Sequence, residues 1–156
     1  GVDGHVAGRA GLQLGDLRPV GVAGQALHEQ LGMLRQFGVA DLVGAMLQQA
    51  TTTAPAYRLY ALPNTTPPKP GLLRVAPGEG ERIEIEVWEM PLSEYGSFVA
   101  LVPAPLSIGS LQVADGSSVQ GFLCEPLALQ DAADITHLGG WRAYIASLAP
   151  APVATT

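Results

Sequence analysis

Residues 108–125 read IGSLQVADGSSVQGFLCE, and they carry the strongest local indication of the fold. Two strand-like runs, 108–114 and 117–125, flank the pair Asp115 and Gly116. An Asp-Gly pair between such runs predicts a type I′ turn, because glycine adopts a positive φ without steric cost. The stretch therefore predicts a β-hairpin within an antiparallel sheet.

The segments upstream of this hairpin also alternate with the period of a strand. Ile83, Ile85 and Val87 alternate with two glutamates and a tryptophan, which predicts a strand buried on one face. We expect Glu84 and Glu86 to lie on its solvated face. The same period predicts a strand over 57–62 and a short one over 72–76, with a proline-rich loop over 63–71 and a turn over 77–80.

Helical spacing appears at both ends of the chain and once in the middle. Leu27, Leu31 and Leu34 are four and three residues apart, which predicts a helix over 25–36. Further helices are expected from Leu42 to the threonines at 51–53, over 92–101 and over 141–148. The pattern indicates an α+β or α/β domain with a largely antiparallel, barrel-like sheet. We place the domain at 18–149, with a flexible tail or linker at 1–17 and a disordered tail at 150–156.

The composition excludes several classes of function. Only eight of 156 residues are Lys or Arg and the net charge is −6, so binding to nucleic acid or to an anionic membrane is disfavoured. The single cysteine, Cys124, and three scattered histidines give no metal-ligand spacing. No apolar run is long enough for a transmembrane helix and no signal-peptide pattern begins the chain, so we expect a cytoplasmic protein without metal or cofactor.

Four ordered stretches carry a resemblance to a known family. They read TAPAYRLYALPNTTPPKPGLLRV (53–75), VWEMPLSEYGSFVALVPAPLSIGSLQVADGSSVQGF (87–122), LCEP (123–126) and DITHLGGWRAYIA (134–146). In this order they resemble the C-terminal domain of allophanate hydrolase. The resemblance implies a γ-glutamylcyclotransferase-like fold, a mixed and mostly antiparallel β-barrel with flanking helices.

The resemblance also implies a function in urea degradation. In that family an amidase domain converts allophanate to N-carboxycarbamate, and the C-terminal domain assists the breakdown of N-carboxycarbamate to carbon dioxide and ammonia. An enzyme acting on a small carboxylated amine is thus expected, as a homodimer working with an amidase domain or subunit. The alternative is a catalytically silent domain for dimerisation or for docking to an amidase partner.

The N-terminal stretch PVGVAGQALHEQL (19–31) departs from the family pattern. The family's favoured catalytic histidine falls near Gly21 to Ala23, where this chain has none, and His28 stands where the family has asparagine. His28 is therefore our candidate proton donor, with a surface or helix-boundary histidine as the alternative. The superfamily's cyclotransferase glutamate has no match between Glu94 and Asp115, which argues against glutamyl cyclisation.

The remaining candidate residues would bind the substrate. An anionic ligand needs a cation and hydrogen-bond donors, which Arg58 or Arg142 and Tyr60 could supply; structural ion pairing of the arginines is the alternative. Glu125 either faces a polar ligand or pairs with one of these arginines. Cys124 has no basic neighbour and is interpreted as a buried apolar thiol. The substrate-binding candidates are Arg58, Tyr60, Gly96, Ser97, Pro103 and Glu125.

Overall fold

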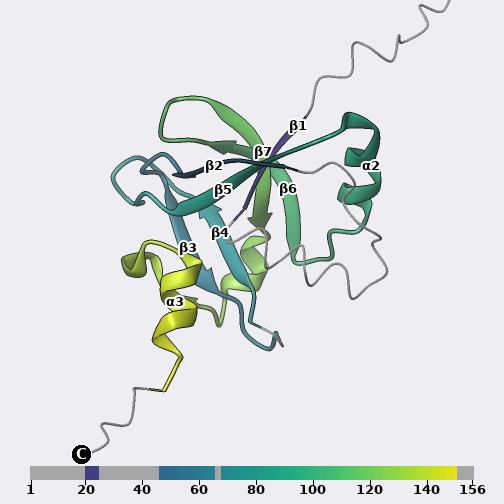
Figure 1. Ribbon diagram of the computed structural model, residues 1–156. Helices are drawn as coiled ribbons and strands as arrows, with labels where there is room; N and C mark the ends of the chain where they lie inside the picture. The colour runs from purple at the N-terminus through teal and green to yellow at the C-terminus, as the bar shows by residue number, and fades with distance from the viewer. Residues whose placement is uncertain (1–19, 25–45, 66–67, 151–156) are drawn as a thin grey trace, which may run out of the picture.

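The computed structural model describes residues 20–24, 46–65 and 68–150 of the chain. Within these ranges the chain forms an α+β domain in which strands dominate (Figure 1). The strands are β1 (Val20–Gly24), β2 (Met46–Thr52), β3 (Tyr57–Ala61), β4 (Pro70–Arg74), β5 (Glu84–Met90), β6 (Leu106–Gln112), β7 (Ser118–Cys124) and β8 (Ala133–Asp134). The helices are α2 (Leu92–Ala100) and α3 (Trp141–Ser147), with the 3-10 turns η2 (Pro126–Leu129) and η3 (Thr136–Leu138). Neither α2 nor α3 is long and apolar enough to cross a membrane.

Five strands form the larger sheet, in the order β2-β5-β1-β7-β6. The strand β1 lies at its centre, with Val22 opposite Trp88 in an antiparallel pair and opposite Gln120 in a parallel pair. The strands β6 and β7 form the predicted hairpin and pair antiparallel along their full length. The sheet is therefore mixed and mostly antiparallel.

Three strands form the smaller sheet, in the order β4-β3-β8. Leu59 of β3 lies opposite Leu72 of β4, and Tyr60 lies opposite Asp134 of β8. The described strands thus form two sheets, and the expected single closed barrel is not seen in this part of the chain. The strands β4 and β7 are in contact, and the Cys124 thiol donates to the Leu72 carbonyl at 3.6 Å, but no ladder of described residues joins the two strands.

The main core lies between the two sheets. Ile83, Ile85 and Val87 are at most 3% exposed, and Tyr57 and Leu59 from β3 are fully buried against the same cluster. The period-two pattern of both segments is confirmed, because alternate residues of a strand point to opposite faces. Burial of side chains of this size contributes about 1.5–3 kcal/mol each, which makes this cluster the main source of stability.

A second core cluster lies on the other face of the larger sheet, beneath α2. It consists of Val22, Met90, Phe98 and Phe122, with the rings of Phe98 and Phe122 packed edge to face at 5.8 Å. The helix α2 begins directly after Pro91, as predicted, and Phe98 is its buried residue. The larger sheet is therefore covered on one face by β3 and β4 and on the other by α2.

The strand β2 corrects one expectation. Helical spacing predicts a helix through Met46 and Leu47, but residues 46–52 form a strand that pairs antiparallel with β5. Thr51 and Thr52 are β-branched and favour extended backbone. The ladder with β5 outweighs the weak periodicity upstream, so the helix prediction is wrong for these residues; 25–45 lie outside the described ranges.

The hairpin between β6 and β7 holds, but its turn type differs from the prediction. Val113 N donates to Ser117 O at 2.8 Å, and Gly116 N donates to Val113 O at 3.0 Å, so the loop has three residues instead of two. Within this turn only Gly116 has a positive φ, of 88°. A type I′ turn needs a positive φ at both central residues, whereas a three-residue loop needs a single left-handed glycine at its end. The loop is further fixed by Asp115, whose carboxylate accepts hydrogen bonds from the backbone and hydroxyl of Ser117.

Candidate functional site

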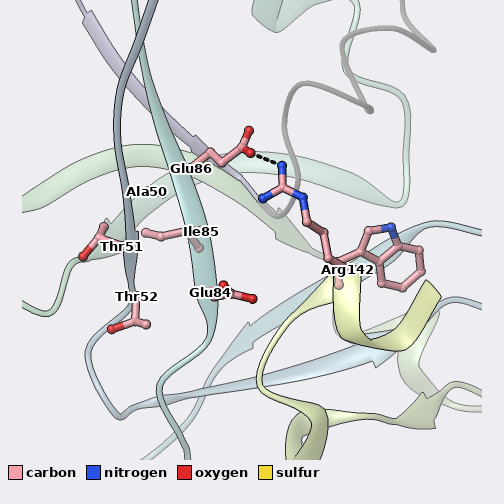
Figure 2. Close-up of a pocket in the computed structure, with 8 residues that line it drawn as sticks. Ala50, Thr51, Thr52, Glu84, Ile85, Glu86 and Arg142 are labelled. Carbon is pink, nitrogen blue, oxygen red and sulfur yellow. Dashed lines mark hydrogen bonds and ion pairs between the residues drawn. The ribbon is translucent and has the colours of Figure 1, made fainter. Parts of the chain in front are cut away.

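A pocket of about 270 Å³ lies between the β2 edge of the larger sheet and α3 (Figure 2). Its lining comes from three elements that are distant in the sequence. They supply Ala50, Thr51 and Thr52 from β2, Glu84, Ile85 and Glu86 from β5, and Trp141 and Arg142 from α3. The volume is close to the lower end of the range for ligand pockets, about 300 Å³, so it can hold a small molecule.

Glu86 is the unusual residue of this pocket, since its carboxylate is buried. The residue is 5% exposed, and its oxygens accept hydrogen bonds from Arg142 Nη2 and, at 3.1 Å, from Trp88 Nε1. Removing an ionised carboxylate from water is costly unless charged or polar partners replace the water. The ion pair with Arg142 and the bond from Trp88 therefore offset part of the cost of a charge at this depth.

Arg142 connects the buried carboxylate to the open part of the pocket. Its side chain is 52% exposed, whereas the Glu86 side chain is 6% exposed. Figure 2 shows the two side chains pointing toward one another from α3 and β5, with Thr51 and Thr52 on the neighbouring strand. A guanidinium offers five N–H donors in a fixed plane, so one such group can bind more than one acceptor.

Two glycines bring α3 close enough for this contact. Glu84 N donates to Gly139 O at 2.8 Å, and Gly139 has a φ of 76°, which favours glycine. A Cβ at Gly140 would lie 2.6 Å from Glu84 Oε2 and 2.9 Å from Glu84 Cβ. The Gly139–Gly140 pair thus lets the start of α3 rest directly on β5.

The charges of the pocket are unequal. Its described lining carries two carboxylates, Glu84 and Glu86, against the guanidinium of Arg142. Glu84 is exposed and Glu86 is buried beneath Arg142. A carboxylate ligand would therefore be attracted by Arg142 and repelled by Glu84.

The sequence-predicted residues Arg58 and Tyr60 lie on β3, outside this pocket lining. Arg58 donates to Asp134 Oδ2 from Nε at 2.8 Å and from Nη2 at 2.6 Å, and to the carbonyl of Glu79 at 2.8 Å. Its ion pair joins β3 to β8, which is the structural alternative considered for this arginine. Tyr60 is half-buried on the same strand.

The other predicted binding residues lie on other elements. Gly96 and Ser97 are exposed on α2, which Figure 1 shows well apart from α3. Pro103 is exposed in the loop after α2, and Glu125 is exposed directly after β7. Arg58 and Arg142 pair with Asp134 and Glu86, so the ion pairs described for these arginines do not involve Glu125. The structure does not bring the six predicted residues together, and their role in binding stays a prediction.

His28 lies outside the described ranges, but the place of the family histidine is described. Gly21, Val22 and Ala23 form the middle of β1, and the last two are fully buried in the two core clusters. Cys124 is buried, as interpreted, and burial raises the pKa of its thiol. Within 20–24, 46–65 and 68–150, no group of three or more His, Cys, Asp or Glu residues could hold a metal ion.

Glu86 is the site residue that the sequence pattern missed. The period of two assigned Glu84 and Glu86 to one solvated face, yet only Glu84 is exposed. The prediction is wrong for Glu86, whose buried carboxylate pairs with Arg142 at the start of α3, 56 residues further along the chain. Trp88, two residues later on the same face, was the available indication, since an aromatic N–H beside a glutamate can satisfy a buried carboxylate.

The comparisons with known proteins agree with this architecture. The allophanate hydrolase C-terminal domain profile matches residues 20–146, so the chain belongs to that family. It is 39% identical over 128 residues to urea amidolyase of Saccharomyces cerevisiae, covering 80% of this chain and 6% of that protein. It is 41% identical over 108 residues to urea amidolyase of Lachancea kluyveri, covering 67% of this chain and 6% of that protein.

Two solved structures are similar to this chain, and one of them is an allophanate hydrolase. Allophanate hydrolase of Kluyveromyces lactis matches with a TM-score of 0.71 and 35% identity, over 88% of this chain and 22% of that one. A uropathogenic E. coli-specific protein matches with a TM-score of 0.69 and 29% identity, over 85% of this chain and 100% of that one. The chain thus corresponds to a small part of the yeast enzymes and to the whole of the bacterial structure.

Proposed function

We propose that this domain assists the breakdown of N-carboxycarbamate to carbon dioxide and ammonia, the second stage of allophanate hydrolysis. Family membership and the urea amidolyase relatives support this place in urea degradation. The observation that carries the proposal is the small charged pocket, in which Arg142 is exposed above the buried carboxylate of Glu86. We also propose that the fold is γ-glutamylcyclotransferase-like.

The reaction requires that the substrate is held in position and that its nitrogen receives a proton. When N-carboxycarbamate takes a proton on nitrogen, one C–N bond breaks, its electron pair stays on nitrogen, and carbon dioxide and carbamate form. Carbamate then takes a second proton on nitrogen, its remaining C–N bond breaks, and carbon dioxide and ammonia form. A domain that holds a carboxylate and delivers the proton would accelerate the first cleavage. The proposed donor is His28.

We also propose that an amidase domain or subunit supplies the substrate and that the assembly is a homodimer. The longer yeast relatives support an amidase in the same chain, because the matching region is a small part of each. An intermediate that decomposes readily would reach the pocket best from a neighbouring active site.

Docking without catalysis is the second candidate function. It is supported by β1, where the position of the family histidine holds the buried apolar residues Val22 and Ala23. In that case the domain would bind an amidase partner and leave the rate of the second stage unchanged.

Ammonia release separates the two candidates. An isolated amidase domain is supplied with allophanate, and ammonia is followed with and without this chain. A second-stage catalyst should raise the rate to a saturating value as chain is added. An unchanged rate, with another family member active in the same assay, would exclude catalysis and favour docking.

A further inference from the structure

The Glu86–Arg142 ion pair is more than a structural contact, because one partner is buried and the other is open to the pocket. The carboxylate of Glu86 is held on both oxygens, by Arg142 and by Trp88. The Arg142 side chain is 52% exposed and lines the pocket together with the exposed Glu84. A buried anion that fixes a flexible, exposed cation lowers the entropy lost when that cation binds a ligand.

We propose that Arg142 is the residue that binds a ligand carboxylate in this pocket, and that Glu86 is a positioning residue that holds its guanidinium in place. This assignment rests on the proposed function for the nature of the ligand, a small molecule with one or two carboxylates. Arg142 is the cation among the described lining residues. Its planar donors match a carboxylate in two-pronged geometry, which a lysine does not reproduce.

The neighbouring residues place the ligand as well. Thr51 and Thr52, from the edge strand β2, line the pocket on the side away from α3, and Gly139 and Gly140 keep the start of α3 against β5. A ligand carboxylate at Arg142 would thus lie between a rigid strand and the first turn of a helix. The carboxylate of Glu84 repels the second carboxylate of a dianionic ligand, which offsets part of the ligand's attraction to Arg142.

Malonate is a stable probe for this site, because a methylene group replaces the N–H of N-carboxycarbamate. Its dissociation constant is measured on the full chain by calorimetry or by NMR shifts. Arg142→Gln should weaken malonate binding at least about tenfold, since it removes a charge-assisted pair. Arg142→Lys keeps the charge but not the planar donors, and should recover only part of the affinity.

The direction in which Glu86→Gln changes the affinity for malonate decides between the two roles of Glu86. If Glu86 were only a nearby negative charge, removing it would tighten malonate binding. If it positions Arg142, removing it should weaken binding about threefold or more, despite the lost repulsion. Glu84→Gln is the matched control, two residues away on the same strand, and should bind malonate at least as tightly as the native chain.

A double-mutant cycle tests whether Glu86 acts through Arg142. In the Arg142→Gln background, Glu86→Gln should no longer weaken malonate binding, because there is no guanidinium left to position. Equal malonate affinity in the native chain and Arg142→Gln, or tighter binding by Glu86→Gln, would overturn the assignment. If those results came with a chain that still accelerates ammonia release, the proposed function would stand and only this site would be wrong.

Discussion

At the residue scale, Glu86 connects a strand, a neighbouring tryptophan and a distant helix. Its two oxygens accept hydrogen bonds from Trp88 and Arg142, and the bond from Arg142 joins residues 56 positions apart in the sequence. The alternation of 83–88 predicts which residues share a face, and this was confirmed for Ile83, Ile85 and Val87. Alternation cannot say which member of the polar face will be covered by a helix from the other end of the chain.

Gly140 allows that helix to approach, and its replacement is a direct test. Gly140→Ala places a Cβ 2.6 Å from Glu84 Oε2 and 2.9 Å from Glu84 Cβ. We expect the free energy of unfolding to fall by about 1–3 kcal/mol, as for other overpacked contacts, and malonate binding to weaken as α3 shifts. Gly96→Ala is the control, because a Cβ there meets nothing within 4 Å, and it should not destabilise the chain. Equal stabilities of the two variants in urea would contradict the close approach of α3.

Cys124 gives a second test at this scale. The thiol is 5% exposed, and burial raises its pKa, so little reactive thiolate is available in the folded chain. We expect it to react with a thiol reagent at least about a hundredfold more slowly in buffer than in denaturant, because reaction requires local opening. An immediate reaction of the folded chain would show that β4 does not cover β7 at this point.

At the scale of elements, the small strand β8 is tied to β3 by a charged pair. Partial burial acts to raise the pKa of Asp134, but hydrogen bonds from Thr136 and the ion pair with Arg58 lower it overall. A lowered folded-state pKa means that the pair stabilises the fold above the ordinary aspartate pKa of about 3.9, and that this contribution is lost as the pH falls through the folded value.

Asp134→Asn should therefore destabilise the chain near neutral pH and do so less as the solution becomes acidic. The measurement is urea unfolding of both proteins at a series of values from about pH 7 to about pH 2. The difference in the free energy of unfolding should shrink as the pH falls below about 3.9, where the carboxylate of the unfolded chain gains its proton, and vanish below the lower folded-state pKa of Asp134. A difference that stays constant over the series would mean that the charge of Asp134 contributes nothing.

The turn η3 is anchored to β3 by a buried hydroxyl. Leu59 N donates to Thr136 Oγ1 at 2.9 Å, and Thr136 is 4% exposed. Thr136→Val leaves this amide without its acceptor and should cost about 1–3 kcal/mol of stability. Ser147→Ala removes an exposed hydroxyl bond on α3 and should cost about 0.5 kcal/mol or less. Similar losses from both variants, measured by thermal unfolding, would contradict the anchoring role of Thr136.

The elements show where local patterns suffice and where they fail. The strand β3, the hairpin of β6 and β7, α2 and α3 were predicted from periodicity and turn residues, and all four are confirmed. The strand β2 was not predicted, because Met46 and Leu47 continue a helical spacing. Pairing with β5 decides the conformation of these residues. The turn after Val113 has three residues, because backbone bonding sets the loop length and the Asp-Gly pair permits more than one.

At the scale of the molecule, the sequence predicts the α+β class and the family but not the arrangement of the site. Two sheets pack around a main core and α2 covers the outer face, an outcome of long-range pairing that local patterns do not encode. The pocket joins β2, β5 and α3, whose positions along the chain give no indication that they meet. The six predicted binding residues are spread over other elements for the same reason.

Catalysis at the Arg142 pocket is tested by the rate of carbon dioxide release from N-carboxycarbamate produced in place by an amidase domain. The rate is followed as this chain is added, for the native protein, for Arg142→Gln and for Arg74→Gln, which changes an exposed arginine of β4. We expect a saturable acceleration by the native chain and by Arg74→Gln, and about a tenth of that acceleration or less with Arg142→Gln. The same acceleration by all three proteins would contradict the claim that the pocket at Arg142 is where this domain works.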